Sequence, residues 1–120
     1  MPYVDGFLLV VPRKNMKAYV AIARRAGKVW REYGALDYKE CAGDDLKAMK
    51  GVMSFPKLAR TKARETVVFS WITYKSKAHR DGVNKKVMKD ERIAGMMKDK
   101  MPFDPKRMAY GGFRVVVDNP

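Results

Sequence analysis

Several residue types are scarce in this chain of 120 residues, and each scarcity excludes a class of protein. Only one cysteine is present, Cys41, so no disulfide can form within the chain, and a reducing cytoplasm is the compartment we expect. One histidine, His79, and one cysteine are too few for a dedicated metal site. No apolar run approaches the length of a membrane span, and the apolar stretch near the N-terminus is short and interrupted by Asp5, unlike a signal peptide. The sequence therefore predicts a cytoplasmic protein without a metal centre.

Positive charge is abundant. Lysine and arginine number 26 against 13 acidic residues, which gives a net charge of +13. Such a charge favours acidic or polyanionic partners, but it also keeps a protein soluble, so charge alone does not decide the function. Hydrophobic residues make up 47% of the chain, enough for one packed core, and we expect a single domain over residues 1–120.

The pattern of apolar residues predicts four strands and two main helices. Asn15 is a candidate N-cap for the first helix, which we expect to end near Gly34, and Ser76 is a candidate N-cap for the second, which reaches about Met88. The segment 43–65 resembles a long excursion with one short helical turn. A further short turn is expected at 90–98, and the strands at 3–12, 36–42, 66–74 and 109–119. This order is β-α-β-β-α-β, an α+β ferredoxin-like arrangement.

The expected strands are apolar on both faces. In the first strand, Phe7, Leu9 and Val11 point to one side, while Val4, Leu8 and Val10 point to the other. In the last strand, Phe113, Val115 and Val117 oppose Tyr110 and Val116. A four-stranded sheet with helices on one side is normally polar on its open side. We therefore predict that a second copy covers the open face, in a homodimer with its sheets face to face.

Several long motifs resemble the YbaA-like family of small bacterial proteins. They run in the same order over essentially the whole chain: "YVDGFLLVVP", "AGKVWREYGALDYKECAGDDL", "SFPKLA", "ETVVFSWITYKSKAHRDGVNKKVMKD" and "MPFDPKRMAYGGF". The resemblance implies a ferredoxin-like subunit of the dimeric α/β-barrel superfamily. That family has no settled activity, and wider relatives include cofactor-free monooxygenases, haem-degrading monooxygenases and small isomerases. These analogies are of fold, so they leave open whether this chain is an enzyme.

The haem-degrading relatives imply one candidate set of catalytic residues. They use an Asn on the first strand, a Trp on a central strand and a His on the next helix, and this sequence has Asp5, Trp71 and His79 at roughly comparable places. Asp5 departs from the amide of that pattern, so the cofactor stays unknown, with haem as one option. His79 would act as the acid, base or ligand, and its alternative is a structural residue near the helix start. Plain core is favoured for Trp71, and core or pocket wall is favoured over a nucleophile for Cys41.

A cleft between sheet and helices is the predicted ligand site. We expect a small, anionic or aromatic organic molecule there, with Tyr74 and Asp5 shaping the pocket and Arg80 holding an anionic group. Phe55, in the loop that includes Pro56, would close over the ligand, and the flexible thioether of Met53 would adapt to it.

The alternative is a non-enzymatic basic protein that meets RNA or another polyanion through its surface. Its lysines and arginines are spread along the chain, and "YGGFRVVV" lies on the last strand rather than on the third, where RNA-recognition modules carry their aromatic signature. Specific recognition of nucleic acid is therefore not expected, while salt-sensitive association stays open.

Overall fold

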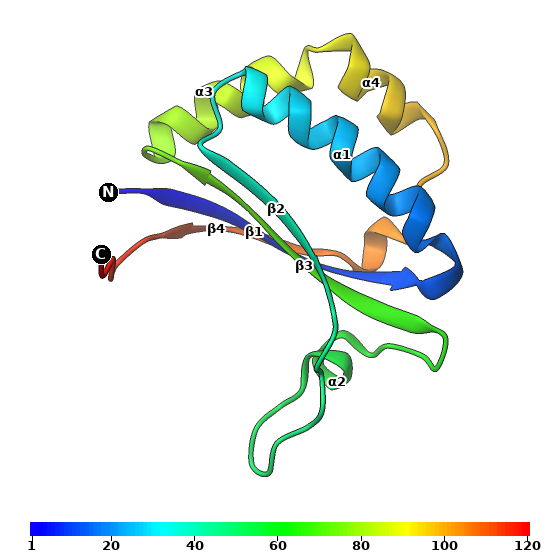
Figure 1. Ribbon diagram of the computed structural model, residues 1–120. Helices are drawn as coiled ribbons and strands as arrows, with labels where there is room; N and C mark the ends of the chain where they lie inside the picture. Colours follow the sequence, from blue (N-terminus) through cyan, green and yellow to red (C-terminus); the bar gives the residue numbers. More distant parts are fainter.

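A computed structural model describes all residues 1–120 and contains one sheet with helices on one of its faces (Figure 1). The strands are β1 (Tyr3–Pro12), β2 (Asp37–Ala42), β3 (Glu65–Tyr74) and β4 (Ala109–Arg114); the helices are α1 (Met16–Glu32), α2 (Phe55–Ala59), α3 (Lys77–Met88) and α4 (Glu91–Lys98), with short 3₁₀ turns at Arg13–Asn15 and Pro105–Arg107. The predicted β-α-β-β-α-β order is confirmed. None of the helices combines the length and the apolar character that crossing a lipid bilayer demands.

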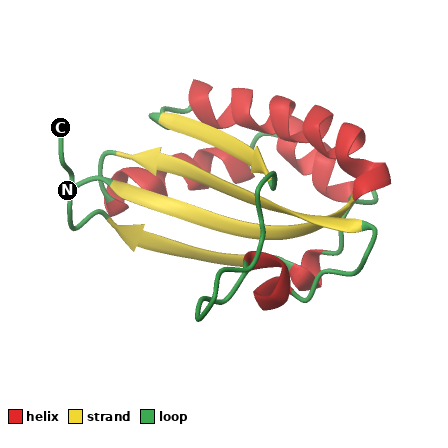
Figure 2. Ribbon diagram, turned by 60° about the horizontal axis from the view of Figure 1, so that its bottom comes forward, coloured by secondary structure: helices red, strands yellow, loops and turns green.

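The four strands form one antiparallel sheet in the order β2-β3-β1-β4. The two ten-residue strands, β1 and β3, lie in the centre and pair along their whole length, from Tyr3 opposite Tyr74 to Pro12 opposite Glu65. Helices α1, α3 and α4 cover one face, which we call the covered face, and α2 lies on the opposite, open face (Figures 1 and 2). This is the ferredoxin-like arrangement.

Alternation along the central strands builds the core on the covered face. Leu9 and Val11 of β1 pack with Val68 of β3 and with Tyr19 and Ala23 of α1. A second cluster joins the other end of β3 to α1, α3 and α4; its buried members are Val29, Ala35, Ile72, Tyr74, Val83, Val87 and Ile93. The structure therefore confirms that Leu9 and Val11 share one face of β1, as the alternation in the sequence predicts.

Capping side chains set the starts of α3 and α4. The Ser76 hydroxyl accepts a hydrogen bond from the His79 backbone N–H, as expected, and the Asp90 carboxylate accepts one from the Arg92 backbone N–H. Asn15 precedes α1, but its side chain makes no cap; it donates to the Pro102 carbonyl at 3.0 Å instead. The Asn15 side chain thus ties the start of α1 to the connector before β4, a contact that local sequence does not reveal.

The last strand is shorter than the sequence pattern predicts. β4 ends at Arg114, which pairs with Tyr3, the first residue of β1. Beyond that point one backbone bond follows, from the Val115 N–H to the Pro2 carbonyl at 3.1 Å, and Val116 and Val117 are exposed. The expected strand positions of Val115 and Val117 are therefore wrong, because a strand cannot extend past the neighbour it pairs with.

Candidate ligand pocket

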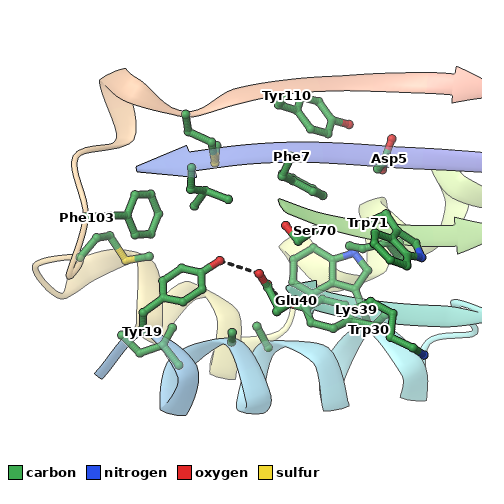
Figure 3. A pocket seen from close by; sticks show the side chains of 18 of the residues that line it. Asp5, Phe7, Tyr19, Trp30, Lys39, Glu40, Ser70, Trp71, Phe103 and Tyr110 are labelled. Carbon is green, nitrogen blue, oxygen red and sulfur yellow. Dashed lines mark hydrogen bonds between the residues drawn. The ribbon is translucent and has the colours of Figure 1, made fainter. Parts of the chain in front are cut away.

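A cavity of about 460 Å³ lies between the sheet and the helix layer. Fifteen of its twenty lining residues are hydrophobic, so removing its walls from contact with water is favourable. In Figure 3, Asp5 and Tyr110 lie towards one end and Tyr19 and Phe103 towards the other. Aromatic side chains from α1, β1, β4 and the connector before β4 form much of the wall: Phe7, Tyr19, Trp30, Phe103 and Tyr110. The position between sheet and helices agrees with the cleft that the sequence predicts.

Asp5 places a carboxylate at one end of this cavity. It sits in the middle of the sheet between Ile72 and Gly112, and only 1% of its surface is exposed. The Arg80 Nε lies 3.6 Å from Asp5 Oδ1, an ion-pair distance too long for a hydrogen bond, and neither atom has another hydrogen-bonding partner. Burial raises the pKa of the Asp5 carboxyl, and the positive charge of Arg80 opposes this rise only in part.

Glu40 supplies a second carboxylate to the same cavity. β2 carries it on the covered face, opposite Ser70 of β3. The Tyr19 hydroxyl donates to Oε1 at 2.7 Å and the Tyr38 hydroxyl to Oε2 at 2.9 Å, so each oxygen of Glu40 already has a partner. Burial and the neighbouring carboxylate raise the pKa of both tyrosines, which therefore remain neutral donors at physiological pH.

Asn84 joins the aromatic residues of the pocket to α3. Its side-chain oxygen accepts from Trp30 Nε1 at 3.1 Å and from the Tyr74 hydroxyl at 3.2 Å. Tyr74 is fully buried behind this contact, and burial raises the pKa of its phenol. Asn84 and Trp30 line the cavity, whereas Tyr74 supports them from behind.

His79 and Arg80 lie at the start of α3, outside the cavity wall. His79 Nδ1 accepts from the Lys75 backbone N–H at 3.0 Å, and its ring packs edge-on against Tyr74 with centroids 5.9 Å apart. Arg80 donates to the hydroxyl oxygens of Tyr3 and Tyr110, both at 3.2 Å. The structure brings Arg80 next to Asp5 but keeps His79 in a local turn contact.

The remaining sequence candidates lie on or near the open face. Phe55 packs against Phe69 there, with ring centroids 6.0 Å apart, and Trp71 stands opposite Gly6 and Lys39 with its ring 5.8 Å from that of Phe69. Met53 is exposed in the loop before α2. Phe55 and Met53 thus do not reach the cavity, while Trp71 contributes to it and also to a hollow of about 650 Å³ on the open face.

Cys41 differs from the sequence expectation. Its register opposite Phe69 places it on the open face, and it is exposed rather than part of a core or pocket wall. The expectation assumed that a small apolar residue in a strand would be buried. On an edge strand with an uncovered face, no packing partner buries it.

Sequence reasoning gave no pocket role to most of the polar and aromatic residues that line the cavity, among them Glu40, Asn84 and Tyr110. Alternation along β2 carried a signal for Glu40, since it shares a face with Tyr38. Tyr110 was assigned to the face of β4 opposite Phe113 without a role. Asn84 carried no signal, because its partners Trp30 and Tyr74 are distant in sequence.

A family model described as "Protein of unknown function (DUF1428)" matches residues 2–105. The chain belongs to this family. Consistent with the resemblance of its motifs, this DUF1428 member is 43% identical over 118 residues to the "Uncharacterized protein YbaA" of Escherichia coli K12, covering 98% of this chain and 99% of that protein.

Solved structures similar to this DUF1428 member share its fold at low identity. Rv0793 from Mycobacterium tuberculosis superposes with a TM-score of 0.61 at 11% identity, covering 100% of both chains. A dimeric ferredoxin-like protein from an uncultured marine organism gives a TM-score of 0.50 at 11% identity, covering 99% of this chain and 100% of that one. At such identity the likeness establishes the ferredoxin-like fold.

Proposed function

We propose that the protein binds a small, largely apolar aromatic molecule in the cavity between sheet and helices. The observation that carries the proposal is the cavity itself: about 460 Å³, lined mainly by hydrophobic and aromatic side chains, with a few polar groups converging on it. Ligand sites in proteins commonly measure roughly 300–1,000 Å³ and have this combination of apolar walls and few polar groups. An acid–base or isomerase-like reaction at Asp5 is compatible with this site and is not required by it.

The charges around the cavity favour a neutral ligand over the anionic one that the sequence suggests. Its two acidic side chains, Asp5 and Glu40, disfavour a second negative charge. Lys39, the one lysine or arginine in the cavity wall, pairs its ammonium with Asp37 at 2.5 Å, and both residues start from the open face by register. Arg80 is already committed to the Asp5 carboxylate and to two tyrosine hydroxyls. No free cation is therefore directed into the cavity to hold an anion.

A cavity-filling substitution tests the proposal. Ala26→Phe places a ring in the cavity from α1, while Ala21→Phe makes the same change at an exposed position of the same helix. We expect the neutral fluorescent probe N-phenyl-1-naphthylamine to bind wild type and Ala21→Phe alike, and to bind Ala26→Phe at least about 10-fold more weakly. Equal binding to all three proteins, or no binding to wild type, would overturn the proposal. Circular dichroism of each variant checks that the fold is retained.

The open face supports a homodimer in which two sheets pack face to face. Its surface is apolar: Phe69 of β3 is 47% and Phe113 of β4 60% exposed in the single chain, and the hollow that they line has further apolar residues in its wall. An exposed apolar surface of this kind normally faces a partner. The ferredoxin-like protein from the marine organism is itself described as dimeric. A second copy is the partner whose surface matches by symmetry.

Ionic strength separates this assembly from association with RNA. Each copy carries a net charge of +13, so added salt screens the repulsion between two copies and favours the dimer. Binding to phosphates weakens steeply under the same change. Sedimentation equilibrium between about 50 and 500 mM salt is expected to show a dimer whose dissociation constant falls or stays constant. A monomer at all salt concentrations would overturn the face-to-face dimer.

A further inference from the structure

Asp5 is a buried hydrogen-bond acceptor without a donor. Its Oδ1 has no hydrogen-bonding partner, although only 1% of the residue is exposed and it lines the cavity wall. Buried polar atoms in proteins are nearly always paired, and leaving one unpaired is costly. Oδ1 itself is enclosed and faces Arg80, so the Asp5 carboxylate as a whole, as part of the wall of an apolar cavity, is the acceptor that a ligand donor would meet.

The nearby donors of Tyr74, Trp30 and Arg80 are directed to other acceptors. The Tyr74 hydroxyl and Trp30 Nε1 both donate to the side-chain oxygen of Asn84. The two terminal nitrogens of Arg80 donate to the hydroxyl oxygens of Tyr3 and Tyr110, and its Nε remains 3.6 Å from Asp5. The arrangement holds the guanidinium beside the carboxylate without closing a hydrogen bond to it.

The second carboxylate of the cavity does not offer the same opportunity. Both oxygens of Glu40 accept hydrogen bonds from tyrosine hydroxyls, at 2.7 and 2.9 Å. A ligand donor at that end would have to displace an existing partner. At the Asp5 end it would not, so the ligand's polar group is expected there.

The chemistry around Asp5 selects the kind of donor. Arg80 Nε lies 3.6 Å from Asp5 and 3.3 Å from the exposed carboxylate of Asp81, so its positive charge offsets that of Asp5 in part and reduces the advantage of a cationic amine over a neutral group. The walls beside Asp5 are aromatic: the rings of Phe7 and Tyr110 stack with centroids 5.0 Å apart, and both line the cavity with Trp30. A flat apolar body with one neutral donor fits these surroundings.

We infer that the ligand is an aromatic compound with a phenol-type hydroxyl, and that Asp5 binds it by accepting the hydrogen bond of that hydroxyl. This inference rests on the proposed function and adds to it the chemical class of the ligand and the residue that recognises it. Figure 3 shows Asp5 and Tyr110 side by side at the end of the pocket where the hydroxyl would lie. Phe7 and Trp30 would contact the aromatic body.

A series of naphthalenes that differ in one substituent tests the inference. The probes are 2-naphthol, 2-methoxynaphthalene, which lacks the donor hydrogen, and naphthalene, which lacks the oxygen as well. We expect wild type to bind 2-naphthol about 10-fold more tightly than either of the others, because a hydrogen bond to a carboxylate is charge-assisted. Isothermal titration or displacement of N-phenyl-1-naphthylamine measures the three affinities.

Two carboxylate-to-amide variants locate the recognition within the pocket. Asp5→Asn is expected to bind 2-naphthol about 10-fold more weakly and the other two probes unchanged, since the amide loses the charge that strengthens the bond. Glu40→Gln makes the same chemical change at the other end and is expected to keep the preference for 2-naphthol. If Asp5→Asn does not fold, the affinity ratio of the wild-type protein decides by itself.

The possible failures are distinguishable. Equal affinity of wild type for 2-naphthol and 2-methoxynaphthalene overturns the inference and leaves the proposed pocket standing. Loss of the preference in Glu40→Gln rather than in Asp5→Asn also overturns it, because the hydroxyl then lies at the wrong end. If N-phenyl-1-naphthylamine and all three naphthalenes fail to bind wild type, the proposed function itself fails.

Discussion

The two faces of the sheet are made from the same four strands but meet different surroundings. The covered face packs against α1, α3 and α4, buries Leu9, Val68 and Tyr74, and still encloses a cavity with two carboxylates in its wall. The open face carries only α2 and leaves Phe69 and Phe113 exposed. The covered face is thus a packed core that contains a cavity. The open face is exposed although it has apolar residues typical of a core. This difference is the basis of the two proposals, a small-molecule site on the covered face and a protein interface on the open face.

The largest effect is expected on the open face. Phe113→Asp places a charge beside Gly6 of the central strand β1, where two apolar sheets would meet, and we expect the dimer dissociation constant to rise at least about 100-fold, since aromatic residues dominate interface energies. Val20→Asp, at an exposed apolar position of α1, is the matched control and should leave the dimer intact. Sedimentation equilibrium measures both. An unchanged dimer in Phe113→Asp would show that the copies associate through another surface.

The covered face should respond to pH through Asp5. Burial raises the pKa of this carboxyl above its unfolded value of 3.8, so the folded protein binds the proton more tightly than the unfolded chain does. The stability gained in this way is complete below pH 3.8 and is lost as the pH rises through the raised pKa. Asp5→Asn, which cannot ionise, should therefore gain stability relative to wild type as pH rises from 4 to 7. Urea unfolding across this range gives the difference. A constant difference between the two proteins would mean that Asp5 titrates alike when folded and unfolded.

A smaller effect is expected from the cap of a helix on the covered face. Ser76→Ala removes the acceptor of the His79 N–H bond at 3.1 Å, and the free energy of unfolding should fall by about 1 kcal/mol. Ser76→Asp, which can also cap, should preserve most of the stability and serves as the control. Thermal or chemical denaturation measures both variants. If the free energy of unfolding of Ser76→Ala hardly changes, packing rather than the Ser76 cap determines where α3 starts.

The smallest effect is expected from the corresponding cap on the open face. Ser54 accepts from the Lys57 N–H at 3.2 Å, but α2 has five residues and no buried side chain, so Ser54→Ala should cost at most a few tenths of a kcal/mol in the single chain. If α2 takes part in the dimer, the disordering of α2 in Ser54→Ala would instead weaken self-association. Comparing unfolding at low and high protein concentration separates the two cases.

Local patterns were sufficient to predict the framework. The alternation of Leu8 and Leu9 set the two faces of β1, Ser76 marked the start of α3, and Gly34, with φ of 112°, marked the end of α1. Each of these depends on residues within a few positions of one another. The apolar open face, and with it the expected dimer, followed from the same alternation.

The pocket was only partly predictable, because its polar contacts join distant segments. Asn84 meets Trp30 across 54 positions, and the donor of Tyr19 reaches Glu40 across 21. Asp5 was expected in the pocket through the family resemblance, and the structure places Asp5 in the cavity wall. Its unpaired oxygen, however, depends on a separation of 3.6 Å from Arg80 that no spacing in the chain encodes.

The alternation of β1 has a consequence for genetics. Asp5 and Leu9 line the pocket, Val4, Gly6 and Leu8 line the hollow on the open face, and Phe7 borders both. A mutational scan along this strand should therefore give phenotypes with a period of two: substitutions at odd positions alter what the protein binds, and those at even positions alter how copies assemble. Apart from Phe7, a single change then acts on one of the two proposed properties, so selection can adjust the proposed ligand and the proposed assembly separately although a single strand carries both.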